Sequence, residues 1–292
     1  MEPVFPIDIK LNLLEGKKFY RYSYNEYTTI NGETHRSELN KNFHVTLKLL
    51  KDEEEERFEY HIEIFDRVHR DKELSLSEKD FLNRIADINN EVVLITDRYG
   101  KLKNLQGLSI LQQRVEKAVE KLSRSYVGKQ AEDFYTFLKD FYQKEHLVCQ
   151  DFLKNNHFGM ILHQFYGRYD QEDTAKHSVR YRNFMANAII DIEEHVQTEE
   201  MRCDDELLLI QYIGNIPSDK NREMFYGEMK RKEISYNPET DVPKLDKYKG
   251  QILLDFTTKE VLEHKLTIEF SLGENYQKKI IYHIKEISYE EL

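Results

Sequence analysis

Residues 43–49 read FHVTLKL and residues 58–64 read FEYHIEI, so every second side chain in both stretches is apolar. Residues 20–24 (YRYSY) show the same alternation. Because successive side chains of a strand point to opposite faces of its sheet, this pattern predicts three strands with one buried face. Asn31-Gly32 lies between the first two and favours a type I′ hairpin turn. We therefore predict an antiparallel meander at the N-terminal end.

The pattern changes after this meander. Apolar residues recur at helical spacing over 77–88, after which EVVLITD (91–97) and 101–105 are typical of a β-hairpin. Two longer stretches, 108–124 and 130–155, keep a period near 3.6 with charged residues on the opposite side. They predict two amphipathic helices that pack on the sheet or cover its open side.

Strand-like sequence returns in the last part of the chain. We predict strands at 158–165, 206–213, 225–236, 250–256, 261–271 and 276–287, and 179–196 fits a strand or a helix equally. Strands, then helices, then strands indicate an α+β fold with a curved, half-barrel-like antiparallel sheet. One domain over 1–292 is expected, with an N-terminal sheet (17–106), a helical segment (108–155) and a C-terminal sheet (158–292).

Composition excludes several classes of protein. The chain has 292 residues, 39% of them hydrophobic and 12% aromatic, which is enough to build a core. Its formal charge of −11 disfavours nucleic acid and favours a partner with a basic surface. No apolar run approaches the length of a membrane helix, and no secretory signal pattern is visible, so a cytoplasmic location is expected.

Motifs of the common enzyme classes are missing from the sequence. It contains no GxxxxGK[ST], GxGxxG, GxSxG, HExxH or CxxC motif. We therefore expect no cofactor, no metal site, no catalytic residue and no enzymatic activity.

Two weaker groups of residues keep an enzyme as an alternative. Cys149 lies near His146, His157 and His163, a combination that can activate a thiolate, although a small residue in a helix also suits a core. Asp191, Glu194 and His195 are the best candidates for an atypical metal-dependent hydrolase. Consecutive residues point in different directions, however, which favours a solvated charged segment.

Tyrosine is the most unusual feature of the composition. There are 19 tyrosines and no tryptophan, and Tyr20, Tyr22, Tyr24 and Tyr27 lie in one segment. Tyrosine offers a large contact area with a polar tip, so these four predict a binding surface. The alternative is that they line the buried face of a curved sheet.

Three parts of the chain carry a resemblance to a known class. They are the hairpin 92–105 (VVLITDRYGKLKNL), the helical pair after it, and the ending 250–270 (GQILLDFTTKEVLEHKLTIEF). Together they resemble bacterial half-barrel proteins of the lipoprotein-carrier type, in which helices cross the open side of a curved sheet. The resemblance implies this fold and carries over no catalytic residue.

These observations favour a non-enzymatic protein-binding module. An adaptor, a secretion chaperone or an immunity-like, toxin-neutralising protein of bacteria would fit them. The first alternative is a half-barrel carrier of an apolar small molecule or lipid, and the second is the metal-dependent hydrolase. A carrier requires an inward face of apolar side chains that encloses a cavity of roughly 300–1,000 Å³.

Overall fold

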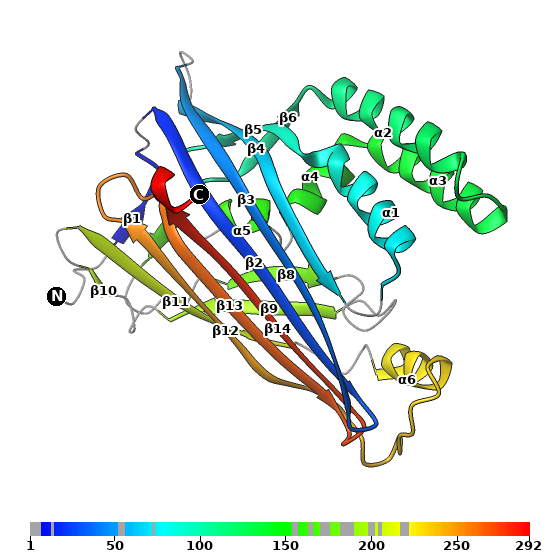
Figure 1. The fold of residues 1–292 in the computed structure, drawn as a ribbon. Helices are drawn as coiled ribbons and strands as arrows, with labels where there is room; N and C mark the ends of the chain where they lie inside the picture. Colours follow the sequence, from blue (N-terminus) through cyan, green and yellow to red (C-terminus); the bar gives the residue numbers. More distant parts are fainter. Residues whose placement is uncertain are drawn as a thin grey trace.

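The fold is an open antiparallel sheet covered in part by helices, as the sequence predicts (Figure 1). The computed structural model describes residues 7–12, 15–51, 56–71, 74–153, 157–162, 166–169, 176–181, 190–197, 202–203, 206–216 and 222–292. Within these ranges a twelve-stranded sheet has the order β6-β5-β4-β3-β2-β14-β13-β12-β11-β9-β8, with β10 paired to β11. Short strands β1 and β7 form a separate pair.

All the strand pairs are antiparallel. The strand bounds are β1 (Ile7–Ile9), β2 (Gly16–Ile30), β3 (Glu33–Lys51), β4 (Glu56–Asp71), β5 (Glu91–Asp97), β6 (Leu102–Gln106), β7 (Gly167–Tyr169), β8 (Lys176–Tyr181), β9 (Ile190–Val196), β10 (Arg202–Cys203), β11 (Leu207–Asn215), β12 (Pro243–Asp255), β13 (Val261–Leu272) and β14 (Tyr276–Ile287). The helix bounds are α1 (Leu76–Ala86), α2 (Leu108–Ser123), α3 (Lys129–Tyr142), α4 (Glu145–Phe152), α5 (His157–Ile161) and α6 (Arg222–Arg231).

The alternating stretches of the sequence form the centre of the sheet. Phe43, Val45 and Leu47 of β3 are buried and face the buried side chains of β4 across the strand pair. Asn31 and Gly32 both have positive φ, as the predicted type I′ turn between β2 and β3 requires. The predicted meander is confirmed.

Strand β2 also pairs with β14, near the other end of the chain. The pairing runs from Phe19 opposite Ile287 to Ile30 opposite Tyr276. This contact joins the N-terminal and C-terminal strands into one continuous sheet. In Figure 1 helices α1, α2 and α3 stand beside β4 and β5, and α6 lies near the far end of the long strands.

Three predicted elements are wrong: the helix over 130–155 and the strands at 158–165 and 225–236. The expected helix over 130–155 is divided into α3 and α4, which are separated at Gln143 and Lys144. Residues 158–165 were expected to form a strand, but α5 covers 157–161. All five of its residues are buried, so it has no polar face and its sequence shows no helical period.

Helix α6 replaces most of the strand that was expected at 225–236. Its buried residues Phe225 and Met229 are four positions apart, which is a helical spacing. The Phe225 ring packs 5.0 Å from the ring of Phe270 in β13. This contact places α6 against the sheet.

Candidate functional site

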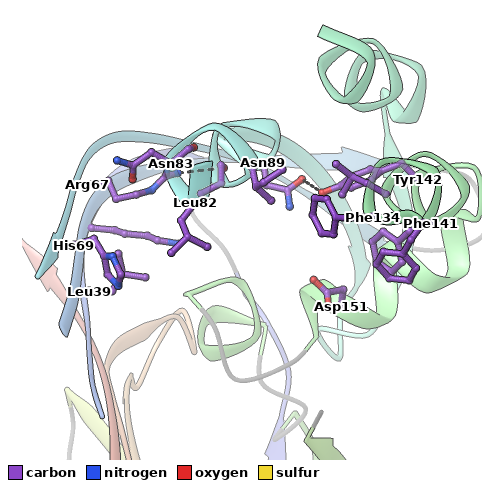
Figure 2. Close-up of a pocket in the computed structure, with 15 residues that line it drawn as sticks. Leu39, Arg67, His69, Leu82, Asn83, Asn89, Phe134, Phe141, Tyr142 and Asp151 are labelled. Carbon is purple, nitrogen blue, oxygen red and sulfur yellow. Dashed lines mark hydrogen bonds between the residues drawn. The ribbon is translucent and has the colours of Figure 1, made fainter. Parts of the chain in front are cut away.

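A cavity lies between the sheet and the helices. It has a volume of about 700 Å³ and is lined by residues of β3, β4, α1, α3 and α4. This volume lies within the range of small-molecule sites. Figure 2 shows Arg67 and His69 on the side of the sheet, with the rings of Phe134 and Phe141 across the space from them.

One wall of this pocket is apolar and comes from helices α1 and α3. Phe134, Phe137, Leu138 and Phe141 of α3 line it at helical i, i+3, i+4 and i+7 spacing. Leu82 and Ile85 of α1 continue the same wall. Phe137 is 61% exposed, a large fraction for an aromatic side chain in a folded protein. The wall therefore offers apolar surface that nothing in the described chain covers fully.

The opposite wall is basic and comes from the sheet. Lys41 of β3 lies directly opposite Arg67 of β4, and Leu39 lies directly opposite His69. A β-bulge in β4 produces this arrangement. Phe65 is the extra residue, because Phe43 pairs with Ile64 while Asn42 pairs with Asp66. Even-numbered residues of β4 face the core before the bulge, and odd-numbered residues face the pocket after it.

Arg67 anchors the end of α1 as well as lining the pocket. Its guanidinium group donates hydrogen bonds to the carbonyl oxygen of Ala86 (3.2 Å) and to Asp87 Oδ1 (3.1 Å). It also donates to the side chain of Asn90. Burial lowers the pKa of Arg67, against the opposing effect of Asp87. The carbonyl contacts place a cation at the negative end of the helix dipole.

Lys41 is held in different surroundings. Its Nζ donates a hydrogen bond of 3.3 Å to Nδ1 of His157, and it lies 5.9 Å from the centre of the Tyr22 ring. Burial, together with the positive charge of Arg67, lowers the pKa of Lys41 to about 7. Lys41 forms no ion pair with any carboxylate of the described residues.

His157, at the start of α5, lies behind Lys41 and is 4% exposed. Burial lowers the pKa of His157, and the charges of Lys41 and Arg67 add to this effect. The imidazole is therefore neutral, with Nδ1 as the acceptor and the proton on Nε2. The basic cluster, defined as Lys41, Arg67, His69 and His157, thus places the Lys41 amine beside the Arg67 guanidinium.

Asn89, Tyr142 and Asp151 also line the pocket. The Tyr142 hydroxyl donates a hydrogen bond of 2.9 Å to Asn89 Oδ1, which ties α3 to the segment after α1. Asp151 belongs to α4 and lies away from Arg67 and His69 in Figure 2. The pocket therefore has a basic end at the sheet and a single carboxylate near α4.

The four tyrosines of the predicted binding surface separate into two groups. Tyr20 and Tyr22 are each 3% exposed and belong to the core, where the Tyr20 hydroxyl donates to the carbonyl of Val261 (3.1 Å). Tyr24 and Tyr27 are partly exposed, and the Tyr27 ring lies 5.5 Å from the Arg36 guanidinium. A contact role for the segment stays a prediction, with Tyr24 and Tyr27 as its accessible members.

The candidate metal ligands do not share a face of their strand. Glu194 is buried on the inner face of β9, whereas Asp191 and His195 lie on the other face. The Tyr248 hydroxyl donates a hydrogen bond to Glu194, and burial raises the pKa of this carboxyl group to about 7. Among the described residues, no group of three or more potential ligands is arranged to hold a metal ion.

The candidate nucleophile Cys149 is half-buried in α4 and packs against the core. Burial raises the pKa of its thiol to about 11, so the thiol stays protonated at neutral pH. Of the three histidines named with it, His163 lies outside the described residues.

Sequence reasoning named His157 only as a neighbour of Cys149 and missed the basic cluster as a group, although one signal was present. Lys41 continues the odd-numbered series Phe43, Val45 and Leu47, so the alternation already places it on the buried face. Arg67 and His69 have no such signal, because the bulge at Phe65 inverts the alternation before them.

Comparisons with known proteins show no family for this chain. No family model and no curated protein matches the sequence. Among solved structures, one describing lipid–protein interactions in lipovitellin is similar, with a TM-score of 0.36, 8% identity, and coverage of 94% of this chain and 25% of that one. The chain thus spans about a quarter of the length of that structure.

A second solved structure is DynF from the dynemicin biosynthesis pathway of Micromonospora chersina. It has a TM-score of 0.21 and 5% identity, with coverage of 99% of this chain and 89% of that one. Within the described part of this chain, no helix is both long and apolar enough to cross a membrane.

Proposed function

We propose that this protein binds an apolar small molecule in the pocket between β3, β4 and helices α1 and α3. The observation that carries the proposal is the cavity of about 700 Å³ with a wall of phenylalanine and leucine side chains. An apolar ligand would gain roughly 25 cal/mol for each Å² of surface removed from water. A carrier needs no catalytic group, which agrees with the expectation of a non-enzymatic protein.

The experiment is a fluorescent-probe titration combined with mass spectrometry of organic extracts from purified protein. An apolar probe such as anilinonaphthalene sulfonate is titrated into the wild type and into Leu82→Trp. Leu82 lies on the pocket wall and is 43% exposed, so the larger ring fills the cavity without entering the core. We expect saturable binding to the wild type and binding at least fivefold weaker to the variant.

The matched control is Leu76→Trp in the same helix. Leu76 is 87% exposed and is not part of the pocket lining. It adds the same ring without occupying the cavity, so binding should match that of the wild type. Equal binding to all three proteins, or no saturable binding, would refute the proposal.

A protein-binding module is the second candidate, and an aromatic cluster on the outer face of the sheet favours it. The Phe19 ring lies 6.5 Å from Phe65 and 5.6 Å from Tyr289. Phe65 is 46% exposed and Tyr289 is 74% exposed. Tyr27 is on the same face of β2 as Phe19, because both are odd-numbered. Aromatic residues are enriched in protein interfaces.

The test of this second candidate is a tagged pull-down with the wild type and with the double variant Phe65→Ser and Tyr289→Ser. If this face binds an adaptor target, a secretion substrate or a toxin, one stoichiometric partner is retained by the wild type and lost from the variant. A partner retained equally by both proteins excludes this face.

A further inference from the structure

The basic cluster places the Lys41 amine beside the Arg67 guanidinium, where burial makes positive charge costly. Lys41 and Arg67 are direct cross-strand neighbours, and like charges in that position destabilise a strand pair. Arg67 has Asp87 as an ion-pair partner. Lys41 contacts neutral His157 instead, and forms no ion pair with a carboxylate in the described part of the chain.

Hydrogen-bonding capacity is also left over at this position. Nε of Arg67 and Nε2 of His157 are buried and have no hydrogen-bond partner among the described residues. The Arg67 side chain is 10% exposed and His157 is 4% exposed. Buried N–H groups are nearly always paired in folded proteins, so each unpaired group calls for a partner or an explanation.

The rest of the pocket fixes the polarity of a molecule that would pair with Lys41 and Arg67. The aromatic wall of α3 lies across the cavity from Arg67 and His69 (Figure 2). A ligand with one anionic end and one apolar end therefore fits in a single orientation.

We propose that the ligand of this pocket is an anionic amphiphile, whose carboxylate or phosphate head group binds Lys41 and Arg67 while its chain lies along the aromatic wall. This inference rests on the proposed function, since it specifies the ligand class of the same pocket. Charge-assisted hydrogen bonds to a buried cation are strong enough to dominate the choice between head groups.

The experiment compares three probes with the same ten-carbon chain: decanoate, decyl phosphate and decanol. Each is titrated calorimetrically, below its aggregation concentration, into the wild type, Lys41→Met and Lys41→Arg. We expect the better anion to bind the wild type at least tenfold more tightly than decanol does. Lys41→Met should weaken anion binding by about 10- to 100-fold and leave decanol within twofold, and Lys41→Arg should retain the preference.

Lys48→Met is the matched control. Lys48 is exposed on the same strand, and its even number places it on the opposite face from Lys41. Its removal changes the net charge equally but should not change the preference for anions. Thermal unfolding of each variant shows whether it is folded. If Lys41→Met does not fold, the comparison of anion with alcohol in the wild type still decides whether the pocket prefers an anionic head group.

The outcomes separate the two proposals. Decanol that binds as tightly as both anions overturns the anionic head group but leaves the apolar pocket in place. Equal weakening of anion and alcohol by Lys41→Met also overturns it, because Lys41 would then act on the pocket and not on charge. Absence of binding by all three probes overturns both proposals. The ratio of decanoate to decyl phosphate affinity distinguishes a carboxylate from a phosphate source.

Discussion

Glu194 illustrates how a single buried residue links stability to pH. It is fully buried on β9, accepts a hydrogen bond from Tyr248, and has its pKa raised by burial from 4.5 to about 7. The folded state therefore holds a proton that the unfolded chain releases above its own pKa. Stability from this group is complete below about pH 4.5 and is lost as the pH rises through about 7.

We expect Glu194→Gln to remove this dependence, because glutamine stays neutral and still accepts from Tyr248. Between pH 4.5 and 8 the variant should gain up to about 3 kcal/mol relative to the wild type. Urea unfolding at four pH values measures the difference. Glu193→Gln, partly exposed on the other face of β9, is the control and should follow the wild type. Parallel curves for Glu194→Gln and the wild type would contradict the assignment.

Individual residues also show what sequence can predict about the site. Lys41 was predictable as an inward-facing lysine from its place in the alternating series of β3. His157 was not, because a buried helix was mistaken for a strand and its first residue had no assigned face. His157, the hydrogen-bond partner of Lys41, lies 116 positions away along the chain, so local sequence patterns do not reveal this contact.

At the scale of elements, α1 determines the shape of the apolar wall and its start is fixed by a capping box. Ser75 accepts a hydrogen bond from the backbone N–H of Glu78 (3.2 Å), and the Glu78 carboxylate accepts from the backbone N–H of Ser75 (2.8 Å). The helix predicted over 77–88 begins at Ser77, two residues later. A serine occurs at both positions, so only the backbone geometry distinguishes them.

Substitution separates these two serines. Ser75→Ala should lower the free energy of unfolding by about 1 kcal/mol, because it leaves an N–H of the first turn unpaired. Ser77→Ala should change the free energy of unfolding by less than about 0.5 kcal/mol. Both values come from urea denaturation monitored by circular dichroism. A larger loss for Ser77→Ala than for Ser75→Ala would reverse the assignment of the cap.

Elements with a regular pattern were predicted well, and irregular ones were not. Strands β2 to β4 follow from alternation, β5 follows from the predicted hairpin, and α2 follows from its buried residues Leu111, Val115, Val119 and Leu122. The bulge in β4 has no signature in the sequence, since Phe65 resembles any other apolar strand residue. It nevertheless decides that Arg67, and not Asp66, faces the pocket.

At the scale of the whole molecule, the pairing of β2 with β14 holds the two halves of the sheet together. The sequence pattern identified both strands but could not identify them as neighbours, because it carries no information about partners distant in sequence. Ile284 of β14 is fully buried and lies opposite Tyr22. Its side chain therefore packs where the halves meet.

We expect Ile284→Ala to lower the free energy of unfolding by about 2–5 kcal/mol. If 1–292 is one domain, as the sequence suggests, far-UV and near-UV circular dichroism should report a single transition for wild type and variant alike. Lys285→Ala, at the adjacent exposed position, should have an effect below about 0.5 kcal/mol. Two separate transitions would indicate two domains.

The same strand pair has a consequence for synthesis on the ribosome. Lys18 and Glu286, which form an ion pair beside this junction, are 268 positions apart. At about 5–20 residues per second, translation leaves the edge of β2 without its partner for roughly 15–50 s. During that interval β2 presents a row of unpaired backbone groups to other nascent chains. The yield of folded protein in cells should therefore depend on the rate of elongation and on chaperones that shield strand edges. The stability of the finished protein alone would not predict this dependence.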